Sequence, residues 1–344
     1  MCKRLLVVFG AGASWDVRGA GTDVLRLDKQ PPLAAQLFDG SRYGSIMARY
    51  HGAATLGQRL AGSSGSALEE RLRDFSAHQN PALKEAFKGI PPYLHDVLED
   101  ASWNYVRLPS AYTSFVVAAA GETGHEICAV TLNYDRLLER ALELYQPNTY
   151  EFNSLTHYCS DARQIRVVKA HGSVDWWRPL GTNNWEKGLR NLDLSVRPDT
   201  AQLVVRTRVA DASDMRHASQ YWYPVLTAPL AGKDATHLVC PSDHLQYLKE
   251  FLSGTDKVLF AGTSGYDTDV LDLLASGLPS DWDGRVQHVG NAYANALAES
   301  AERIEQAVPQ LRPAHEKRQH GRSVFGEGFA RYAGSPEMME FLDA

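Results

Sequence analysis

At 344 residues, the chain is long enough for a sizeable hydrophobic core and for two domains, or for one domain with a large insertion. Hydrophobic residues make up 44% of it and charged residues 22%, which is ordinary for a globular protein and excludes disorder over most of its length. A formal net charge of -6 argues against a protein whose main surface binds nucleic acid through electrostatics, so we expect no direct binding of nucleic acid.

The first predicted element is a buried strand that ends in a glycine loop. The stretch RLLVVFGAGASWD, residues 4–16, begins with an apolar run rich in Val and Leu and turns at Gly10, Ala11 and Gly12. Such a run is typical of a central parallel strand that leads through a loop into a helix. Glycines at that point let the backbone approach a pyrophosphate at the helix N-terminus, although a tight turn without a ligand has the same pattern.

The loop departs from the fingerprint of dehydrogenases, which has three glycines. Trp15 stands at the position of the third glycine, and no strand ending in an acidic residue follows about 20 residues later. A dinucleotide domain that serves hydride transfer is therefore disfavoured, and another use of a phosphate loop is favoured.

Residues 17–122 carry little strand character and much helical character. The stretches ALEERLRDFSAH and PPYLHDVLEDASWNYVRL have apolar residues at three- and four-residue spacing, with Pro and Gly between them. The pattern predicts a helical insertion lobe. Because it holds more apolar surface than a cap over one sheet edge needs, we expect this lobe to make contacts in a homo-oligomer.

Strand patterns resume after this lobe and then alternate with helices. EICAVTLNYD at 126–135 precedes the helix candidate DRLLERALELY, and IRVVKAHGSVDW at 165–176 predicts a further strand. Residues 178–236 are irregular and rich in turn formers and aromatic residues. Strand and helix patterns return over 256–278 and 284–306. Strands separated by helices predict a parallel sheet with right-handed crossovers.

We therefore expect the α/β fold class, with a doubly wound, Rossmann-like parallel sheet and a helical insertion lobe. The catalytic domain is expected over 1–310, with the lobe at 17–122 inside it, and residues 311–344 are expected to form a C-terminal tail or helix. The basic segment RPAHEKRQHGR, residues 312–322, is interpreted as a solvated face of that tail.

Cysteine usage indicates a reducing compartment. The four cysteines are Cys2, Cys128, Cys159 and Cys240. They lie far apart and form no C-x-x-C pair, which excludes a sequence-local zinc ribbon and gives no disulfide framework. No stretch approaches the roughly 18 apolar residues of a membrane span, and the pattern of a secretion signal is missing. We expect a cytoplasmic protein that does not contact a membrane.

Four polar motifs follow predicted strands, at the carboxyl ends where ligands of such sheets bind. They are Gly10 to Ser14, Thr131 to Asp135, His171 to Ser173 and Gly262 to Gly265. One such motif arises easily by chance, whereas four along one chain favour a site at this edge of the sheet.

In this order, the four motifs resemble those of the sirtuin fold. GAGAS is similar to the sirtuin phosphate loop, TLNYD to its T-x-N-x-D stretch, KAHGSVDW to the segment with the catalytic histidine, and AGTSGYDTD to the late G-[TS]-S loop. The resemblance spans residues 4–300, with 17–122 and 178–250 covered poorly. It implies a sirtuin-type fold that binds NAD.

Two departures separate the chain from the sirtuins that deacylate proteins. Those enzymes hold a zinc ion with two C-x-x-C pairs after the catalytic histidine, but no cysteine lies between His171 and Cys240 here. Their F-G-E stretch precedes the last glycine loop, whereas Phe325 to Glu327 follows it and is interpreted as coincidence. We therefore expect no zinc.

The stretches NYD, HGSVDW and SGYD are similar to those of the sirtuin-like NADases of bacterial anti-phage defence. This resemblance implies an NAD+ glycohydrolase, which yields ADP-ribose and nicotinamide and depletes NAD in an infected cell. Such proteins are often silent until an invader is sensed. The resemblance therefore also implies a partner, such as a HerA-type ATPase or an Argonaute, or an assembled state.

The implied reaction assigns roles to two residues. Cleavage of the nicotinamide–ribose bond passes through an oxocarbenium-like sugar, and nicotinamide leaves without a general acid. Asn133 is the first catalytic candidate, because its amide can hold the water or the ribose hydroxyls, with a helix cap as its alternative role. His171 is the candidate general base toward water or a ribose hydroxyl.

The remaining candidates bind the nucleotide. We expect Ser14 and the amides of the first loop to bind phosphate, with Thr263 and Ser264 doing the same from the second half of the sheet. We expect Asp135 either to orient Asn133 or to cap the helix that follows it. We expect Asn291 to contact the adenosine ribose. The full predicted set is Gly10, Ala11, Gly12, Ser14, Asp135, Gly262, Thr263, Ser264 and Asn291.

Two rival interpretations are a zinc-free deacylase or ADP-ribosyltransferase, and a non-catalytic sensor that binds NAD or ADP-ribose. The missing zinc module argues against the first. The presence of both Asn133 and His171 argues against the second, because binding alone needs neither. Asp267 and Asp269 are interpreted as caps of the helix that follows them.

Overall fold

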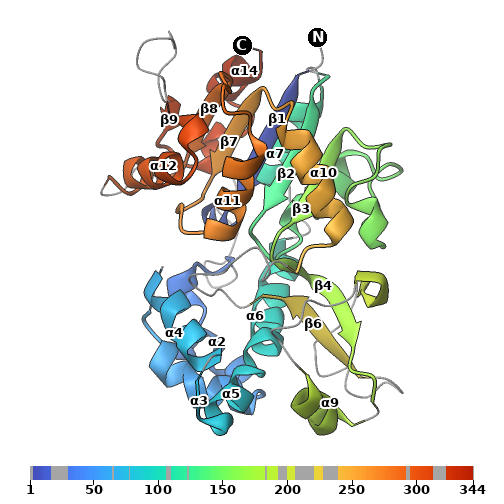
Figure 1. Cartoon of the computed structure of the whole chain (residues 1–344), viewed down its shortest axis with the longest axis vertical. Helices are drawn as coiled ribbons and strands as arrows, with labels where there is room; N and C mark the ends of the chain where they lie inside the picture. The colour runs from blue at the N-terminus through green and yellow to red at the C-terminus, as the bar shows by residue number, and fades with distance from the viewer. Residues whose placement is uncertain are drawn as a thin grey trace.

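The molecule has two lobes, one built on a large parallel sheet and one built on helices and a small sheet (Figure 1). The computed structural model describes residues 3–16, 30–63, 66–76, 78–105, 110–121, 124–182, 184–192, 200–205, 221–227, 239–291, 295–312 and 323–343. None of the helices in these ranges has the length and apolar character that crossing a membrane requires.

The main sheet has six parallel strands in the order β3-β2-β1-β7-β8-β9. Their bounds are β1 (Arg4–Phe9), β2 (Glu126–Thr131), β3 (Ile165–Lys169), β7 (Lys257–Ala261), β8 (Arg285–Val289) and β9 (Ser323–Phe325). Val7 of β1 lies opposite Ala129 of β2 and Leu259 of β7. The strand order changes direction at β1, so ligands of such a sheet bind beyond the carboxyl ends of β1 and β7. The doubly wound α/β fold expected from the sequence is confirmed.

Helices cover both faces of the main sheet, because the side chains of its central strand are apolar on both faces. Leu5, Val7 and Phe9 point to one face, Leu6 and Val8 point to the other, and all five are buried. The helices over the first face are α7 (Ala111–Gly121), α8 (Leu137–Tyr145), α13 (Phe329–Tyr332) and α14 (Pro336–Asp343). Those over the second face are α10 (Ser242–Leu252), α11 (Thr268–Gly277) and α12 (Ala296–Ala307).

The second lobe combines helices with a three-stranded antiparallel sheet (Figure 1). Its helices are α2 (Gly40–Met47), α3 (His51–Leu60), α4 (Ser66–Ser76), α5 (Pro81–Phe87), α6 (Ile90–Tyr105) and α9 (Trp185–Asn191). Its strands are β4 (Gly172–Pro179), β5 (Val204–Val205) and β6 (Trp222–Leu226), in the order β5-β4-β6. Leu56 and Tyr93 of the helices share a buried cluster with Trp177 of β4 and Leu226 of β6, so the lobe has a hydrophobic core of its own.

Several parts of the chain differ from the expectations of the sequence. The single strand expected over 165–176 is two strands, because the chain turns at Gly172, whose φ of 84° favours glycine. The region 178–236, expected to be irregular, contains β5, β6 and α9. Within the expected lobe 17–122, α7 packs on the main sheet instead. The expected tail 311–344 adds β9 to that sheet and α14 to its core. Most of the basic segment, from residue 313 on, lies outside the described residues.

Candidate active site

Two glycine loops interlock at the carboxyl ends of β1 and β7. Helix α1 (Ala11–Trp15) begins directly after Gly10, and Gly12 N donates to Gly262 O at 2.9 Å. A Cβ on Gly10 would lie 2.6 Å from Gly262 O, and a Cβ on Gly262 would lie 2.0 Å from Ala13 N. The φ of Gly262 is 64°, in the region that favours glycine. The two loops therefore need glycine in order to contact each other, apart from any need of a ligand.

Three backbone amides on these loops are available to an anion. Within the part of the chain that the structure describes, the amides of Ala11, Thr263 and Ser264 donate to no other group. Ser264 O accepts a hydrogen bond from Arg303 Nε at 3.0 Å, which fixes the second loop on α12. The residues predicted to bind phosphate from the two halves of the sheet thus lie together.

Asn133 lies between the first glycine loop and α7. Its Nδ2 donates to Gly10 O and Ser14 Oγ, both at 2.9 Å, and lies 3.3 Å from Tyr112 OH. Ser14 Oγ and Tyr112 OH share a further hydrogen bond of 3.0 Å, and burial raises the pKa of Tyr112, so this phenol keeps its proton at neutral pH. Asn133 is 6% exposed, and its Oδ1 accepts no hydrogen bond from any described residue. One atom of the amide therefore fixes the loop, and the other is available to a donor.

Asp135 closes the turn that begins α8, so the alternative role of Asn133 as the cap of this helix is wrong. Asp135 Oδ1 accepts a hydrogen bond from Leu137 N at 3.0 Å, and Asp135 O accepts one from the Lys169 ammonium. The Asp135 side chain is buried, and it is engaged with the protein itself. Its contact with a nucleotide stays a prediction.

His171 lies in the turn between β3 and β4 and pairs with Asp267. The contact joins His171 Nε2 to Asp267 Oδ2. The imidazole is 4% exposed, and its Nδ1 has no hydrogen-bond partner among the described residues. Asp267 Oδ1 accepts a hydrogen bond from Val270 N at 3.2 Å, so the predicted cap of α11 by Asp267 is confirmed. The same prediction for Asp269 is wrong, because this residue lies inside the first turn of the helix. The pairing was not predicted, because the two residues are 96 positions apart and no local pattern reports such a contact.

Tyr134 completes a closed ring of contacts among the four motifs. Its hydroxyl donates to Thr227 O at 2.5 Å, and its ring centroid lies 6.4 Å from that of His171. The first glycine loop is bonded to Asn133, the next residue Tyr134 lies beside His171, and His171 pairs with Asp267, which follows the second glycine loop in the chain. The second loop contacts the first, which closes the ring at the carboxyl edge of the main sheet.

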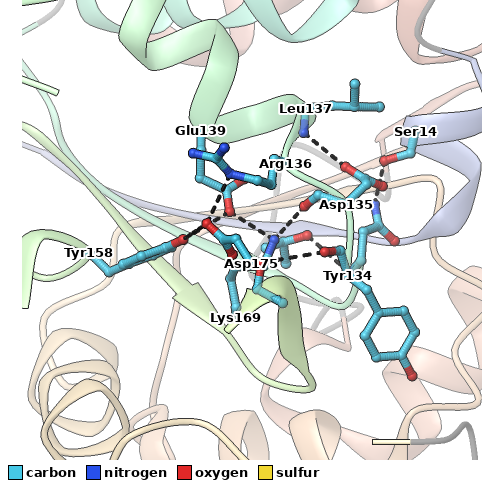
Figure 2. A network of polar contacts seen from close by, with 12 residues as sticks. Ser14, Tyr134, Asp135, Arg136, Leu137, Glu139, Tyr158, Lys169 and Asp175 are labelled. Atoms are coloured by element: carbon cyan, nitrogen blue, oxygen red, sulfur yellow. Dashed lines mark hydrogen bonds and ion pairs between the residues drawn. The ribbon is translucent and has the colours of Figure 1, made fainter. Parts of the chain in front are cut away.

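A buried charged network lies beside this ring (Figure 2). Lys169 Nζ contacts Glu139 Oε1 at 2.8 Å, and both side chains are 0% exposed. Arg136 Nε pairs with Asp175 Oδ2 at 2.9 Å, and Tyr158 OH lies 3.4 Å from an oxygen of each carboxylate. Burial raises the pKa of Glu139, while the Lys169 ammonium acts in the opposite direction. The network ties α8 to β3 and β4, the strands on either side of the histidine turn. Sequence reasoning did not find it.

Asn291 lies at the carboxyl end of β8, beside the C-terminal segment. It forms an isolated bridge with Glu327. A Cβ on Gly328 would lie 2.8 Å from Asn291 Oδ1 and 2.3 Å from Asp16 Oδ2. Asp16 Oδ2 also accepts a hydrogen bond from Ala330 N at 3.0 Å, which joins the end of α1 to the start of α13. The contact of Asn291 with an adenosine ribose stays a prediction.

The cysteines have no geometry that holds a metal in the described residues. No group of three or more His, Cys, Asp or Glu side chains in these ranges is arranged around a common point, and Cys128, Cys159 and Cys240 form no disulfide there. Burial raises the pKa of Cys159 to about 12, so its sulfur is protonated at neutral pH and is a poor metal ligand. Cys2 lies outside the described residues.

The sequence matches a family model described as SIR2-like domain over residues 127–311. Among solved structures, the chain is similar to a Sir2 homologue mutant in complex with ADP-ribose, at 16% identity, over 92% of this chain and 95% of that chain, with a TM-score of 0.39. A second such mutant complex has 14% identity over the same shares, 92% and 95%, and a TM-score of 0.40. A Sir2 homologue–NAD complex has 15% identity over 90% of this chain and 89% of that chain, with a TM-score of 0.34. No curated protein matches the sequence.

Proposed function

Because the chain belongs to the SIR2-like domain family, whose model covers more than half of it, we propose that it hydrolyses NAD+ to ADP-ribose and nicotinamide. The observation that supports this proposal most is the closed ring of contacts among the four motifs. The ring combines an amide that keeps a free oxygen, a buried histidine, and two loops whose amides are available to phosphate. These are the groups that cleavage of a pyridine dinucleotide needs.

The reaction requires a positioned water molecule and a group that accepts a proton. The nicotinamide–ribose bond breaks through an oxocarbenium-like sugar, and nicotinamide leaves as a neutral molecule with the bonding electrons, so no general acid is needed. Water adds to C1′ of the ribose and loses a proton. NAD+ and water thus give ADP-ribose, nicotinamide and a proton.

In this proposal each group of the ring has one task. Asn133 holds the attacking water or the ribose hydroxyls through Oδ1, because its Nδ2 is already fixed on the first loop. His171 accepts the proton of the water or of a ribose hydroxyl. The amides of Ala11, Thr263 and Ser264 hold the pyrophosphate from both halves of the sheet.

The proposal includes a role in anti-phage defence, on the basis of the motifs NYD, HGSVDW and SGYD. There the reaction depletes NAD in an infected cell, in the cytoplasm. A HerA-type ATPase or an Argonaute is the kind of partner that would activate the enzyme, and assembly into a homo-oligomer is the other route.

Nicotinamide release by the purified full chain, alone and with such a partner, tests the proposal. We expect Asn133→Ala and His171→Ala to lower turnover by about a hundredfold or more, the scale for loss of a positioned acid–base group. The affinity of His171→Ala for NAD+ is expected to stay within about tenfold, or ~1.4 kcal/mol. The exposed residues Asn148 and His51 provide the matched controls Asn148→Ala and His51→Ala, which should behave as wild type.

Two other results would contradict the hydrolase. Binding of NAD+ without nicotinamide release in an activated preparation would support the sensor. Nicotinamide release that depends on an acylated peptide or a protein acceptor would support the deacylase or the ADP-ribosyltransferase.

A further inference from the structure

The His171–Asp267 pair joins two distant parts of the main sheet. His171 follows β3 and Asp267 follows β7, and β2 and β1 lie between these strands. Neighbouring strands are about 4.8 Å apart, so the ends of β3 and β7 are separated by roughly 14 Å. The pair therefore spans the carboxyl ends of β1 and β2, where the first glycine loop and Asn133 lie. The His171–Asp267 contact therefore belongs to the candidate active site and does more than pack one helix or strand.

We propose that Asp267 is a positioning residue that fixes the tautomer of His171, an inference that rests on the hydrolase proposed above. In a neutral imidazole, one nitrogen carries the hydrogen, and the hydrogen bond that the ring makes decides which one. The Asp267 carboxylate accepts the hydrogen of Nε2. The lone pair is then on Nδ1, which is the atom that takes up the proton of the water or of a ribose hydroxyl.

The state of Nδ1 supports this assignment independently. Nδ1 is buried and has no partner in the described part of the chain. Buried polar atoms of native proteins are nearly always hydrogen-bonded, so such an atom within a ring of candidate site residues indicates a group that a ligand or a water supplies.

Asparagine at position 267 separates the positioning role from helix capping. Asn caps helices as well as Asp does, so Asp267→Asn keeps the oxygen that accepts from Val270 N at 3.2 Å. The amide nitrogen then takes the place of Oδ2 and donates to Nε2 of His171, which moves the imidazole hydrogen to Nδ1 and removes the lone pair there. We expect Asp267→Asn to keep the fold, whereas His171 should no longer accept a proton at Nδ1.

Long-range 1H–15N NMR on the full chain with labelled histidine reads the tautomer directly. His171→Gln identifies the signal of His171 among the 12 histidines. We expect the Nε2–H tautomer in the wild type and the Nδ1–H tautomer in Asp267→Asn. In the same variant we expect kcat to fall on the order of a hundredfold, with a KM for NAD+ within about threefold and an unchanged melting temperature. Asp272→Asn, at an exposed position of α11, is the matched control and should change none of these.

The two measurements separate this inference from the function on which it rests. The same His171 tautomer in the wild type and in Asp267→Asn, or full kcat in that variant, would overturn the positioning role. A wild type that releases no nicotinamide in an activated preparation contradicts the hydrolase instead. The tautomer comparison then still decides on the positioning role, because it needs neither NAD+ nor turnover.

Discussion

At the scale of single residues, Gly10 should affect both the packing of the two glycine loops and the binding of NAD+. One methyl group there would lie 2.6 Å from Gly262 O, so Gly10→Ala should push the two loops apart. Gly262 N donates to Val289 O, so the disturbance should extend to β8. We expect Gly10→Ala to lower both the melting temperature and the affinity for NAD+, measured by thermal unfolding and calorimetry.

Gly44 provides the control for this prediction. It lies inside α2, and a Cβ there would have no neighbour within 4 Å. Gly44→Ala is expected to leave binding unchanged and to stabilise the chain by about 0.5–1 kcal/mol, since Ala loses less conformational freedom than Gly in a helix. Wild-type stability and affinity in Gly10→Ala would show that the loops adapt to the added methyl group.

The sequence predicts the candidate catalytic residues but not their partners. Asn133 and His171 are recognisable because each is a polar residue directly after a buried strand. Tyr112 and Asp267, which bond to them, are not recognisable in this way. Tyr112 lies on the apolar face of a helix and looks like a core residue, and Asp267 has a sufficient local explanation as a helix cap. Hydrophobic periodicity reports local structure and carries no information about contacts across a sheet.

At the scale of elements, the pair of Lys169 and Glu139 holds α8 on β3. Lys169→Met leaves a carboxylate without its cation in a site with 0% exposure, so the free energy of unfolding should fall by about 3–5 kcal/mol. Adding Glu139→Leu removes the second charge and should restore most of the loss, because an apolar pair carries no desolvation cost. Urea denaturation of both variants measures this coupling. Equal losses in the single and the double variant would argue against a buried ion pair.

The docking of α14 gives the stability a pH dependence. Lys257 Nζ donates to Phe341 O at 2.8 Å and to Leu342 O, near the end of this helix. Burial lowers the pKa of Lys257 from 10.5 to about 8. Between these two values the unfolded chain binds more protons than the folded chain, so this group makes the stability rise with pH there, and below pH 8 its charge lowers the stability.

Lys257→Met should remove this rise. We expect the difference in urea midpoint between wild type and variant to shift in favour of the wild type as the pH passes from below to above 8. Other groups titrate in the same interval, but they do so in both proteins and leave the difference unchanged. Parallel pH profiles of the two proteins would mean that Lys257 titrates as an ordinary lysine.

Five strands of the main sheet were predictable from the sequence, whereas its edge strand β9 and the small sheet were not. Strands β1 and β7 are buried on both faces, so each is a nearly continuous apolar run that ends at a glycine loop. Strands β4, β5 and β6 lie in a region rich in Trp, Tyr and Pro, and β5 has only two residues, so no alternation marks them. The positive φ of Gly172 divides one apparent strand into two, and sequence periodicity does not reveal it.

At the scale of the whole molecule, the apolar surface of the helical lobe has a partner within the chain. Leu56, Tyr93 and their neighbours pack on Trp177 and Leu226 of the small sheet. Among the described residues of 17–122, Val117 is the one large hydrophobic side chain that is exposed. The apolar excess that led us to expect a homo-oligomer is therefore used in the core of the lobe. Oligomerisation stays a prediction, which light scattering at micromolar concentration tests.

Ligand binding should stabilise the molecule as a whole, because the four motifs come from segments between residue 10 and residue 265 and meet in one ring. A ligand that binds only the folded chain adds about 2.7 kcal/mol of stability at a concentration of 100 times its Kd. We expect NAD+ to raise the melting temperature by several degrees in the wild type and in His171→Ala, whose phosphate loops are intact. The shift should be lost in Gly10→Ala, in which the loops are forced apart. An equal shift in Gly10→Ala and wild type would mean that NAD+ binds elsewhere on the molecule, whatever its rate of hydrolysis.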